Sequence, residues 1–289
     1  MTKEEFLKLA QQVIILDGAT GSNLIKAGMP RGVCTEQWVL DHEEVLINLQ
    51  REYVEAGSQI VYAPTFGGNR MSLESFGMES QIEELNKRLV DLSKRAVQGR
   101  AYVAGDLTTC GKILGSCEEA SYEAAFERYK EQITYLVRAG VDLLVAETMI
   151  NIDEAVAAVE AANAVCDLPI MCSMTVEADG TIFSGGSAVE AVQTLQEVGA
   201  SAVGVNCSVG PDQLEAVVAN MKQIAVVPLL VKPNAGMPVI TEKGEAVYSM
   251  SPDDFGRHMK KLVAAGASVV GGCCGTTPEF IKSLSTCIR

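Results

Sequence analysis

Runs of apolar and β-branched residues recur along the whole chain, and each run ends in a small or polar residue. Continuous apolar runs are typical of parallel strands that are buried on both faces. The expected strands are Val13–Asp17, Gln59–Phe66, Ala101–Leu107, Asp142–Thr148, Pro169–Val176, Ala202–Ser208, Pro228–Asn234 and Ser268–Gly275. The regular return of such runs is typical of a fold built from a repeated strand–helix unit.

Amphipathic helical stretches separate these runs, and several of them stop just before a glycine, a common helix terminator. The expected helices include Glu43–Ala56, Glu118–Ala139, Asp153–Asn163, Ala188–Val198 and Pro252–Ala265. Eight strands that alternate with eight helical segments predict an α/β protein, a single (β/α)8 TIM barrel over residues 1–289. A doubly wound open sheet is the structural alternative. No linker or break in composition divides the chain into two domains.

The composition excludes several classes of function. Lys and Arg number 23 and Asp and Glu number 37, so the net charge is 23 − 37 = −14. Such a surface argues against nucleic acid as a partner, because phosphate binding needs clustered basic residues. No apolar run approaches the roughly 20 residues of a membrane span, and the first residues lack the pattern of a signal peptide. We therefore expect a cytoplasmic protein whose nine cysteines are free, catalytic or metal-bound.

Active sites of (β/α)8 barrels lie where the strands end, so the polar residues that finish each run are the candidates. These residues are Asp17, Thr65, Asp106, Glu147, Cys207, Asn234 and the pair Cys273 and Cys274. Pro233, which has no N–H for a strand ladder, marks the end of its strand and is expected to turn Asn234 toward the barrel mouth.

Three cysteines at two strand ends predict a metal site. Flanking glycines allow the adjacent Cys273 and Cys274 to leave the strand pleat and face one point, and Cys207 ends another strand at the same mouth. Three thiolates form a soft site for Zn²⁺, and three protein ligands with an open position are typical of catalytic zinc. A vicinal disulfide and two small buried side chains are the competing interpretations of the pair. Cys110 is the reserve ligand.

The end of the first strand reads Asp17-Gly18-Ala19-Thr20-Gly21. Small residues here can bring several backbone N–H groups to one point, as a cradle for a carboxylate. Asp17 and Glu147 could both face an ammonium group, and Phe66 could form an apolar wall. Together these features fit an α-amino acid as ligand.

Four motifs make the chain resemble a known family. They are Asp17-Gly18-Ala19-Thr20-Gly21, Asn206-Cys207-Ser208-Val209-Gly210-Pro211, Pro233-Asn234-Ala235-Gly236 and Gly271-Gly272-Cys273-Cys274-Gly275-Thr276-Thr277-Pro278. The sequence resembles the zinc-dependent homocysteine S-methyltransferases, and most closely the homocysteine-binding module of cobalamin-dependent methionine synthase.

The resemblance implies a (β/α)8 barrel that binds one Zn²⁺ and homocysteine. It implies that Cys207, Cys273 and Cys274 are the metal ligands and that the substrate thiol is the fourth. It assigns the amino and carboxylate groups of homocysteine to Asp17, Glu147 and the amides of Gly18, Ala19 and Thr20, with Thr65, Phe66 and Asn234 as further substrate residues. It also allows Asn234 to approach the metal when substrate is absent.

The expected reaction is methyl transfer to a homocysteine thiolate, which gives methionine. A free thiol has a pKa of about 8.5, and coordination to Zn²⁺ removes its proton. The resemblance implies a methylated corrinoid as donor, carried by a separate or fused module, although no corrinoid-binding motif occurs in this sequence. S-adenosylmethionine, S-methylmethionine or another donor, and a different thiol or selenol acceptor, remain alternatives. A vicinal-dithiol redox protein and a non-catalytic zinc barrel are the other classes that the residues allow.

Overall fold

The computed structural model describes residues 1–111, 121–207, 209–241 and 246–288. Its main sheet has eight parallel strands in the order β1-β10-β7-β6-β5-β4-β3-β2. These strands are β1 (Ile14–Ile15), β2 (Ile60–Tyr62), β3 (Tyr102–Leu107), β4 (Leu143–Met149), β5 (Ile170–Met174), β6 (Ala202–Cys207), β7 (Leu229–Pro233) and β10 (Ala267–Val270). A parallel bridge between Leu16 and Ile60 joins the first and last strands of this order. The predicted (β/α)8 barrel is confirmed.

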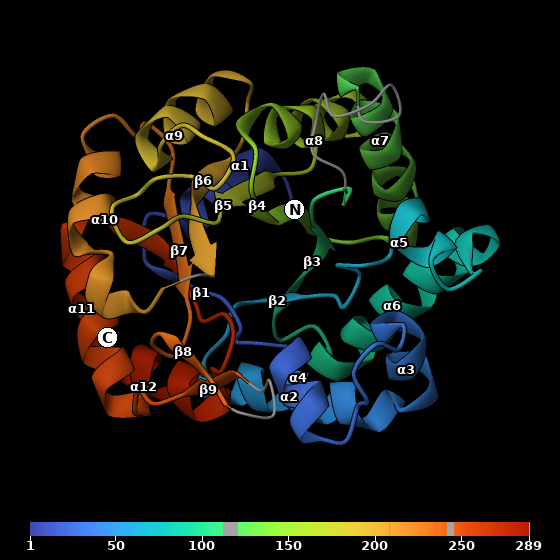
Figure 1. Cartoon of the computed structure of the whole chain (residues 1–289), viewed down its shortest axis with the longest axis horizontal. Helices are drawn as coiled ribbons and strands as arrows, with labels where there is room; N and C mark the ends of the chain where they lie inside the picture. The colour runs from blue at the N-terminus through green and yellow to red at the C-terminus, as the bar shows by residue number, and fades with distance from the viewer. Residues whose placement is uncertain (112–120, 208, 242–245, 289) are drawn as a thin grey trace.

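Helices surround the strands as an outer layer (Figure 1). The longer ones are α4 (Glu43–Ala56), α6 (Ile82–Val97), α7 (Tyr122–Ala139), α8 (Ile152–Val165), α9 (Ala188–Glu197), α10 (Glu215–Lys222), α11 (Pro252–Ala265) and α12 (Pro278–Ile288). The shorter elements are α1 (Lys3–Leu9), α2 (Gly21–Lys26), α3 (Thr35–Asp41), α5 (Arg70–Glu74), η1 (Glu79–Gln81) and η3 (Pro211–Gln213). Gly57 and Gly140 end α4 and α7 with positive φ angles, as the sequence pattern predicts.

Apolar side chains fill the interior of the barrel. One buried cluster combines Phe6 of α1 with residues of the barrel strands, among them Leu143, Val145 and Leu230. Because side chains alternate between the faces of a strand, the residues two positions further along point into the same interior. In β4 the residue two positions after Val145 is Glu147, and in β7 the residue two positions after Leu230 is Lys232. The interior is therefore apolar in its middle and charged at the carboxyl ends of the strands.

Some predicted boundaries are wrong at the barrel mouth. The strand expected over Gln59–Phe66 ends at Tyr62, and the one expected to reach Gly275 ends at Val270. The chain between β7 and α11 also contains an unpredicted antiparallel hairpin of β8 (Pro238–Ile240) and β9 (Ala246–Tyr248). Two expected features, the start of the helix Glu118–Ala139 and the strand end Ser208, lie outside the described residues. No described helix is long and apolar enough to cross a membrane.

Candidate metal and substrate site

A cavity of about 530 Å³ opens at the carboxyl ends of the strands. Its wall contains the three predicted metal ligands, Glu147, Phe66 and the segment Gly18–Ser22. Asp17, Thr65 and Asn234 are not part of this wall, and each of them is almost completely buried. The structure therefore brings most of the predicted site residues to one cavity and places these three outside its lining.

The thiols of Cys207, Cys273 and Cys274 converge at this cavity. Their Sγ atoms all lie within 4.8 Å of one another, and those of Cys207 and Cys274 are 4.0 Å apart. Among the described residues, these three form the single group of His, Cys, Asp or Glu side chains with metal-ligand spacing. Three soft sulfur donors around one point match the preferences of Zn²⁺. Cys110, the reserve ligand, does not belong to this group.

Backbone geometry explains how two adjacent cysteines face one point. Beyond β10 the chain leaves the extended conformation and turns at Gly275, where φ is +82°. The amide N–H of Cys273 donates to the carbonyl of Pro233 at 2.7 Å, and Thr276 Oγ1 donates to the carbonyl of Cys273, also at 2.7 Å. A Cβ at Gly275 would lie 2.4 Å from the ring of Tyr248, so glycine is required there.

Cys207 has an unusual backbone conformation for a residue with a side chain. Its φ angle is +62°, in the left-handed region that costs energy for residues other than glycine. Thr148, which follows Glu147, has the same φ angle, and the pairing of β4 with β5 shifts register between Ala146 and Met149. Both strand ends are therefore distorted where their side chains turn into the cavity.

The three thiols differ in acidity because they share hydrogen bonds. Hydrogen bonds with Cys207 and Cys273 hold the pKa of Cys274 well below the usual range of a thiol. The hydrogen bonds of Cys207 with Cys273 and Cys274, together with burial, raise the pKa of Cys207. The mutual hydrogen bonds therefore favour a shared negative charge within this cluster.

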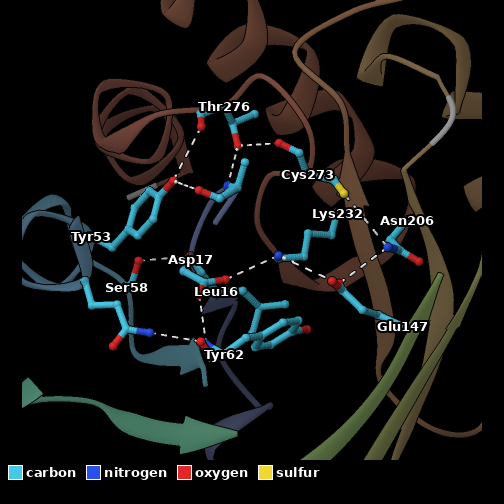
Figure 2. Close-up of polar contacts among 12 residues, drawn as sticks. Leu16, Asp17, Tyr53, Ser58, Tyr62, Glu147, Asn206, Lys232, Cys273 and Thr276 are labelled. Atoms are coloured by element: carbon cyan, nitrogen blue, oxygen red, sulfur yellow. Dashed lines mark hydrogen bonds and ion pairs between the residues drawn. The ribbon is translucent and has the colours of Figure 1, made fainter. Parts of the chain in front are cut away.

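A buried lysine lies between two of the predicted site carboxylates (Figure 2). Lys232 Nζ is 3.3 Å from Asp17 Oδ1 and 3.8 Å from Glu147 Oε2, and it lies 4.4 Å from the ring centre of Tyr62. Burial opposes the charge of Lys232, but the two carboxylates outweigh burial and raise its pKa well above the ordinary value. The other oxygen of Asp17, Oδ2, accepts from the backbone N–H of Tyr62 at 2.8 Å.

Asn206 links Glu147 to the metal-ligand cluster. Its Nδ2 donates to Glu147 Oε2 at 3.4 Å and lies 4.0 Å from Cys273 Sγ (Figure 2). The same Nδ2 donates to Thr148 Oγ1 at 2.9 Å. Its Oδ1 accepts from the N–H of Thr148 at 2.8 Å. Burial raises the pKa of Glu147 to about 7, and the positive charge of Lys232 opposes that rise. Glu147 is thus held by long contacts and faces the cavity.

The remaining predicted residues differ in their contacts with the protein. Thr65 Oγ1 donates to the carbonyl of Asp106 and accepts from its N–H, and the Asn234 side chain is buried with no hydrogen-bond partner for its Oδ1. Within the predicted cradle, the N–H of Ala19 donates to Thr276 Oγ1 at 3.0 Å. Phe66 lies at the cavity and is 38% exposed, which fits a wall residue at the mouth.

Sequence reasoning did not assign roles to Lys232, Asp106 or Asn206. Lys232 lies in the otherwise apolar run Pro228–Asn234, and a charged residue inside a buried strand is the signal that could have found it. Asp106 also lines the cavity, and burial, followed by the charge of Glu147, raises its pKa well above the ordinary value.

A (β/α)8 barrel with three converging thiols and buried charges at its carboxyl end defines a candidate metal-dependent enzyme that acts on a small polar ligand. The family model of homocysteine S-methyltransferases matches residues 14–288. The chain belongs to this family, which confirms the family resemblance found in the sequence.

Two curated relatives agree with this assignment, and a solved structure has a similar fold. The chain is 30% identical to methionine synthase of Mycobacterium leprae (strain TN), and the match covers 97% of the chain and 24% of that relative. It is 29% identical to methionine synthase of Mycobacterium tuberculosis (strain ATCC 25618 / H37Rv), and that match covers 97% of the chain and 25% of the relative. It thus spans about a quarter of the length of these relatives. The fold is similar to that of the metallated homocysteine methyltransferase MmuM from Escherichia coli, with a TM-score of 0.81, 24% identity and coverage of 98% and 99% of the two chains.

Proposed function

We propose that this chain binds one Zn²⁺ through Cys207, Cys273 and Cys274 and catalyses transfer of a methyl group to the thiol of homocysteine, which gives methionine. The observation that carries this proposal is the convergence of the three Sγ atoms, within 4.8 Å of one another, at the wall of the cavity. The donor set fits a catalytic zinc, because it has three soft ligands and leaves one position for the substrate.

When bound, Zn²⁺ would supply a Lewis acid that lowers the pKa of the acceptor thiol and keeps it as a thiolate at neutral pH. The three cysteine thiolates would carry three negative charges to the metal's two positive ones. The resulting net charge of −1 keeps the sulfur of the acceptor electron-rich and nucleophilic. Glu147 would receive the ammonium group of the acceptor, because its carboxylate faces the cavity and makes only long contacts with the protein.

Some of the other predicted substrate residues line the cavity, and others are buried behind its lining. Gly18 and Thr20 line the cavity and would offer backbone N–H groups to the acceptor carboxylate, while Phe66 would cover its apolar stem. The N–H of Ala19 is already engaged with Thr276, so Ala19 would shape the wall. Asp17, Thr65 and Asn234 lie behind the lining, so we propose that they support the residues that touch the acceptor.

For the methyl donor we propose a methylated corrinoid, carried by a separate or fused module, in a cytoplasmic protein. The resemblance to the cobalamin-dependent methionine synthases and the 30% identity to a methionine synthase support this choice. Methylcobalamin, S-adenosylmethionine and S-methylmethionine can be compared directly as donors with the same zinc-loaded protein, with methionine as the measured product. The corrinoid proposal is wrong if either sulfonium donor is used and methylcobalamin is not.

The test of the zinc and acceptor roles is zinc analysis of anaerobically purified protein, followed by homocysteine binding with detection of released protons. We expect about one zinc per chain and one proton released per homocysteine bound below pH 8. A protein that cannot be loaded with zinc but forms a reversible Cys273–Cys274 disulfide would instead be a redox protein. A zinc-loaded protein that unfolds on chelation and does not bind homocysteine would be a structural zinc barrel.

A further inference from the structure

The buried Lys232 has a position that the proposed function leaves unexplained. Asp17 and Glu147 are the two carboxylates that the family resemblance assigns to the ammonium group of the acceptor. Lys232 Nζ lies within 4 Å of both of them, so an ammonium group of the protein already lies between them (Figure 2). The side chains of Lys232 and Asp17 are only 4% and 1% exposed.

The charges of these groups do not balance without a ligand. Asp17 and Glu147 contribute two negative charges, and Lys232 contributes one positive charge, which leaves a net −1. Asp106 also lines the cavity, but burial and the charge of Glu147 raise its pKa well above the ordinary value, so it is counted as neutral. Among the described residues that line the cavity, Lys232 is the single lysine or arginine. An acceptor ammonium would bring these three groups to neutrality. An acceptor without an amine would leave one negative charge unpaired with Lys232 present, and two without it, so Lys232 reduces the cost of losing the amine.

The contacts of the two carboxylates differ. Asp17 Oδ2 accepts from the Tyr62 N–H, and Asp17 Oδ1 is ion-paired with Lys232 Nζ at 3.3 Å without a hydrogen bond. Asp17 does not line the cavity. Glu147 does line the cavity, and its contacts with Lys232 and Asn206 are 3.8 and 3.4 Å long. Glu147 can therefore contact a second cation in the cavity, whereas Asp17 lies behind the cavity wall and contacts only the first.

From this geometry we propose that Lys232 is a specificity-determining residue for the acceptor. Its ammonium is a resident counter-ion, anchored by Asp17, that shares Glu147 with the ammonium of an amino-acid thiol. Because the protein supplies one cation itself, the site also accepts thiol carboxylates that lack an amine, at a small cost in affinity. This inference rests on the proposed roles of Glu147 and of the zinc ligands.

The test compares homocysteine with 4-mercaptobutanoate, which is homocysteine without its amino group. Isothermal titration calorimetry at pH 8.5 gives the Kd of both thiols for the zinc-loaded parent and for the neutral variants Lys232→Met and Lys232→Gln. We expect the parent to prefer homocysteine by less than about tenfold. In the variants the ammonium of homocysteine becomes the only counter-ion, so this preference should increase at least tenfold.

Two control variants separate charge from other effects. Lys232→Arg keeps the positive charge and should keep the parent's ratio of the two Kd values. Lys87→Met removes a remote, exposed lysine that pairs with Asp91 and should also leave this ratio unchanged.

A preference for homocysteine over 4-mercaptobutanoate that stays the same or decreases in both neutral variants overturns the inference, because Lys232 would then only hold the carboxylates in place. A parent preference of a thousandfold or more overturns it without any variant. If homocysteine does not bind to the zinc-loaded parent, the proposed function itself fails.

Discussion

Glu147 and Glu154 are two buried carboxylates seven residues apart, and the protein surrounds them differently. Glu154, in the first turn of α8, accepts hydrogen bonds from Thr109 Oγ1, the N–H of Cys110 and the hydroxyl of Tyr129, all between 2.6 and 3.1 Å. Glu147, in β4, has contacts of 3.4 and 3.8 Å and faces the cavity. A carboxylate with short internal hydrogen bonds stabilises the fold, whereas one with long contacts beside a cavity can bind a ligand.

The cysteines divide in the same way. Burial raises the pKa of both Cys110 and Cys172 to about 12, so these thiols remain protonated and unreactive. In the three-thiol cluster, hydrogen bonds with its two neighbours lower the pKa of Cys274. The residue type is the same, and the difference lies in whether other thiols are close enough to share a proton. In both comparisons the residue proposed for the site lies at a strand end beside the cavity, and the residue proposed to stabilise the fold does not contact the cavity.

The largest effect should come from the three-thiol cluster. We expect Cys274→Ala to reduce zinc from about one per chain to less than about 0.1 and to reduce methyl transfer at least about a thousandfold, because two thiolates cannot complete the ligand set. Metal analysis of anaerobically purified protein and a methionine assay measure the two effects. A Cys274→Ala protein that retains full zinc would exclude this cysteine as a ligand.

The cluster was predictable from the sequence, because parallel strands bring their carboxyl ends to one edge whatever the details of their length. The strand order and the glycine-terminated helices followed from the same periodicity. Lys232 was not assigned a role, although its charge inside an apolar run marks it in the sequence. Its ion pairs with Asp17 and Glu147 become evident only when the register of β7 against its neighbours is known. The β8–β9 hairpin and the left-handed backbone of Cys207 and Thr148 depend on long-range packing, which local patterns do not record.

A second test removes the charge of the ligand-facing carboxylate. Glu147→Gln should weaken homocysteine binding about 10- to 100-fold, because a hydrogen bond to a charged group contributes about 1.5–3 kcal/mol. Zinc content should stay near one per chain, since Glu147 is not among the three converging ligands. Titration calorimetry with homocysteine gives the affinity. Unchanged affinity would mean that the ammonium group binds elsewhere in the cavity.

The matched change at the other carboxylate should affect stability instead. Glu154→Gln replaces an acceptor of several short hydrogen bonds by a neutral amide, and we expect it to lower the free energy of unfolding by about 1.5–3 kcal/mol. Zinc content and homocysteine affinity should remain those of the parent. Urea unfolding of both variants, read beside the calorimetry, measures this contrast. If Glu154→Gln weakened homocysteine binding as strongly as Glu147→Gln, the distinction between the two carboxylates would be wrong.

Glu147 should also make stability depend on pH in the metal-free, reduced protein. Its pKa is raised from 4.5 to about 7 by burial, so the folded protein binds this proton more tightly than the unfolded chain. The stabilisation is complete below pH 4.5 and is lost as the pH rises through 7, on the order of 1–3 kcal/mol. Glu147→Gln lacks this loss. Its melting temperature relative to the parent should therefore increase between pH 4.5 and 8, and a constant difference would show that burial does not raise this pKa.

The smallest effect is expected at Cys110, the reserve metal ligand. Its thiol is buried beside Glu154 and Tyr129 rather than in the three-thiol cluster, and its backbone N–H makes the bond to Glu154. Cys110→Ala keeps that N–H, so we expect a loss of only about 1 kcal/mol in unfolding free energy and no change in zinc content. Zinc analysis beside Cys274→Ala decides the point. Loss of zinc from Cys110→Ala would place this cysteine among the ligands and would mean that buried, internally paired groups also contribute to the site.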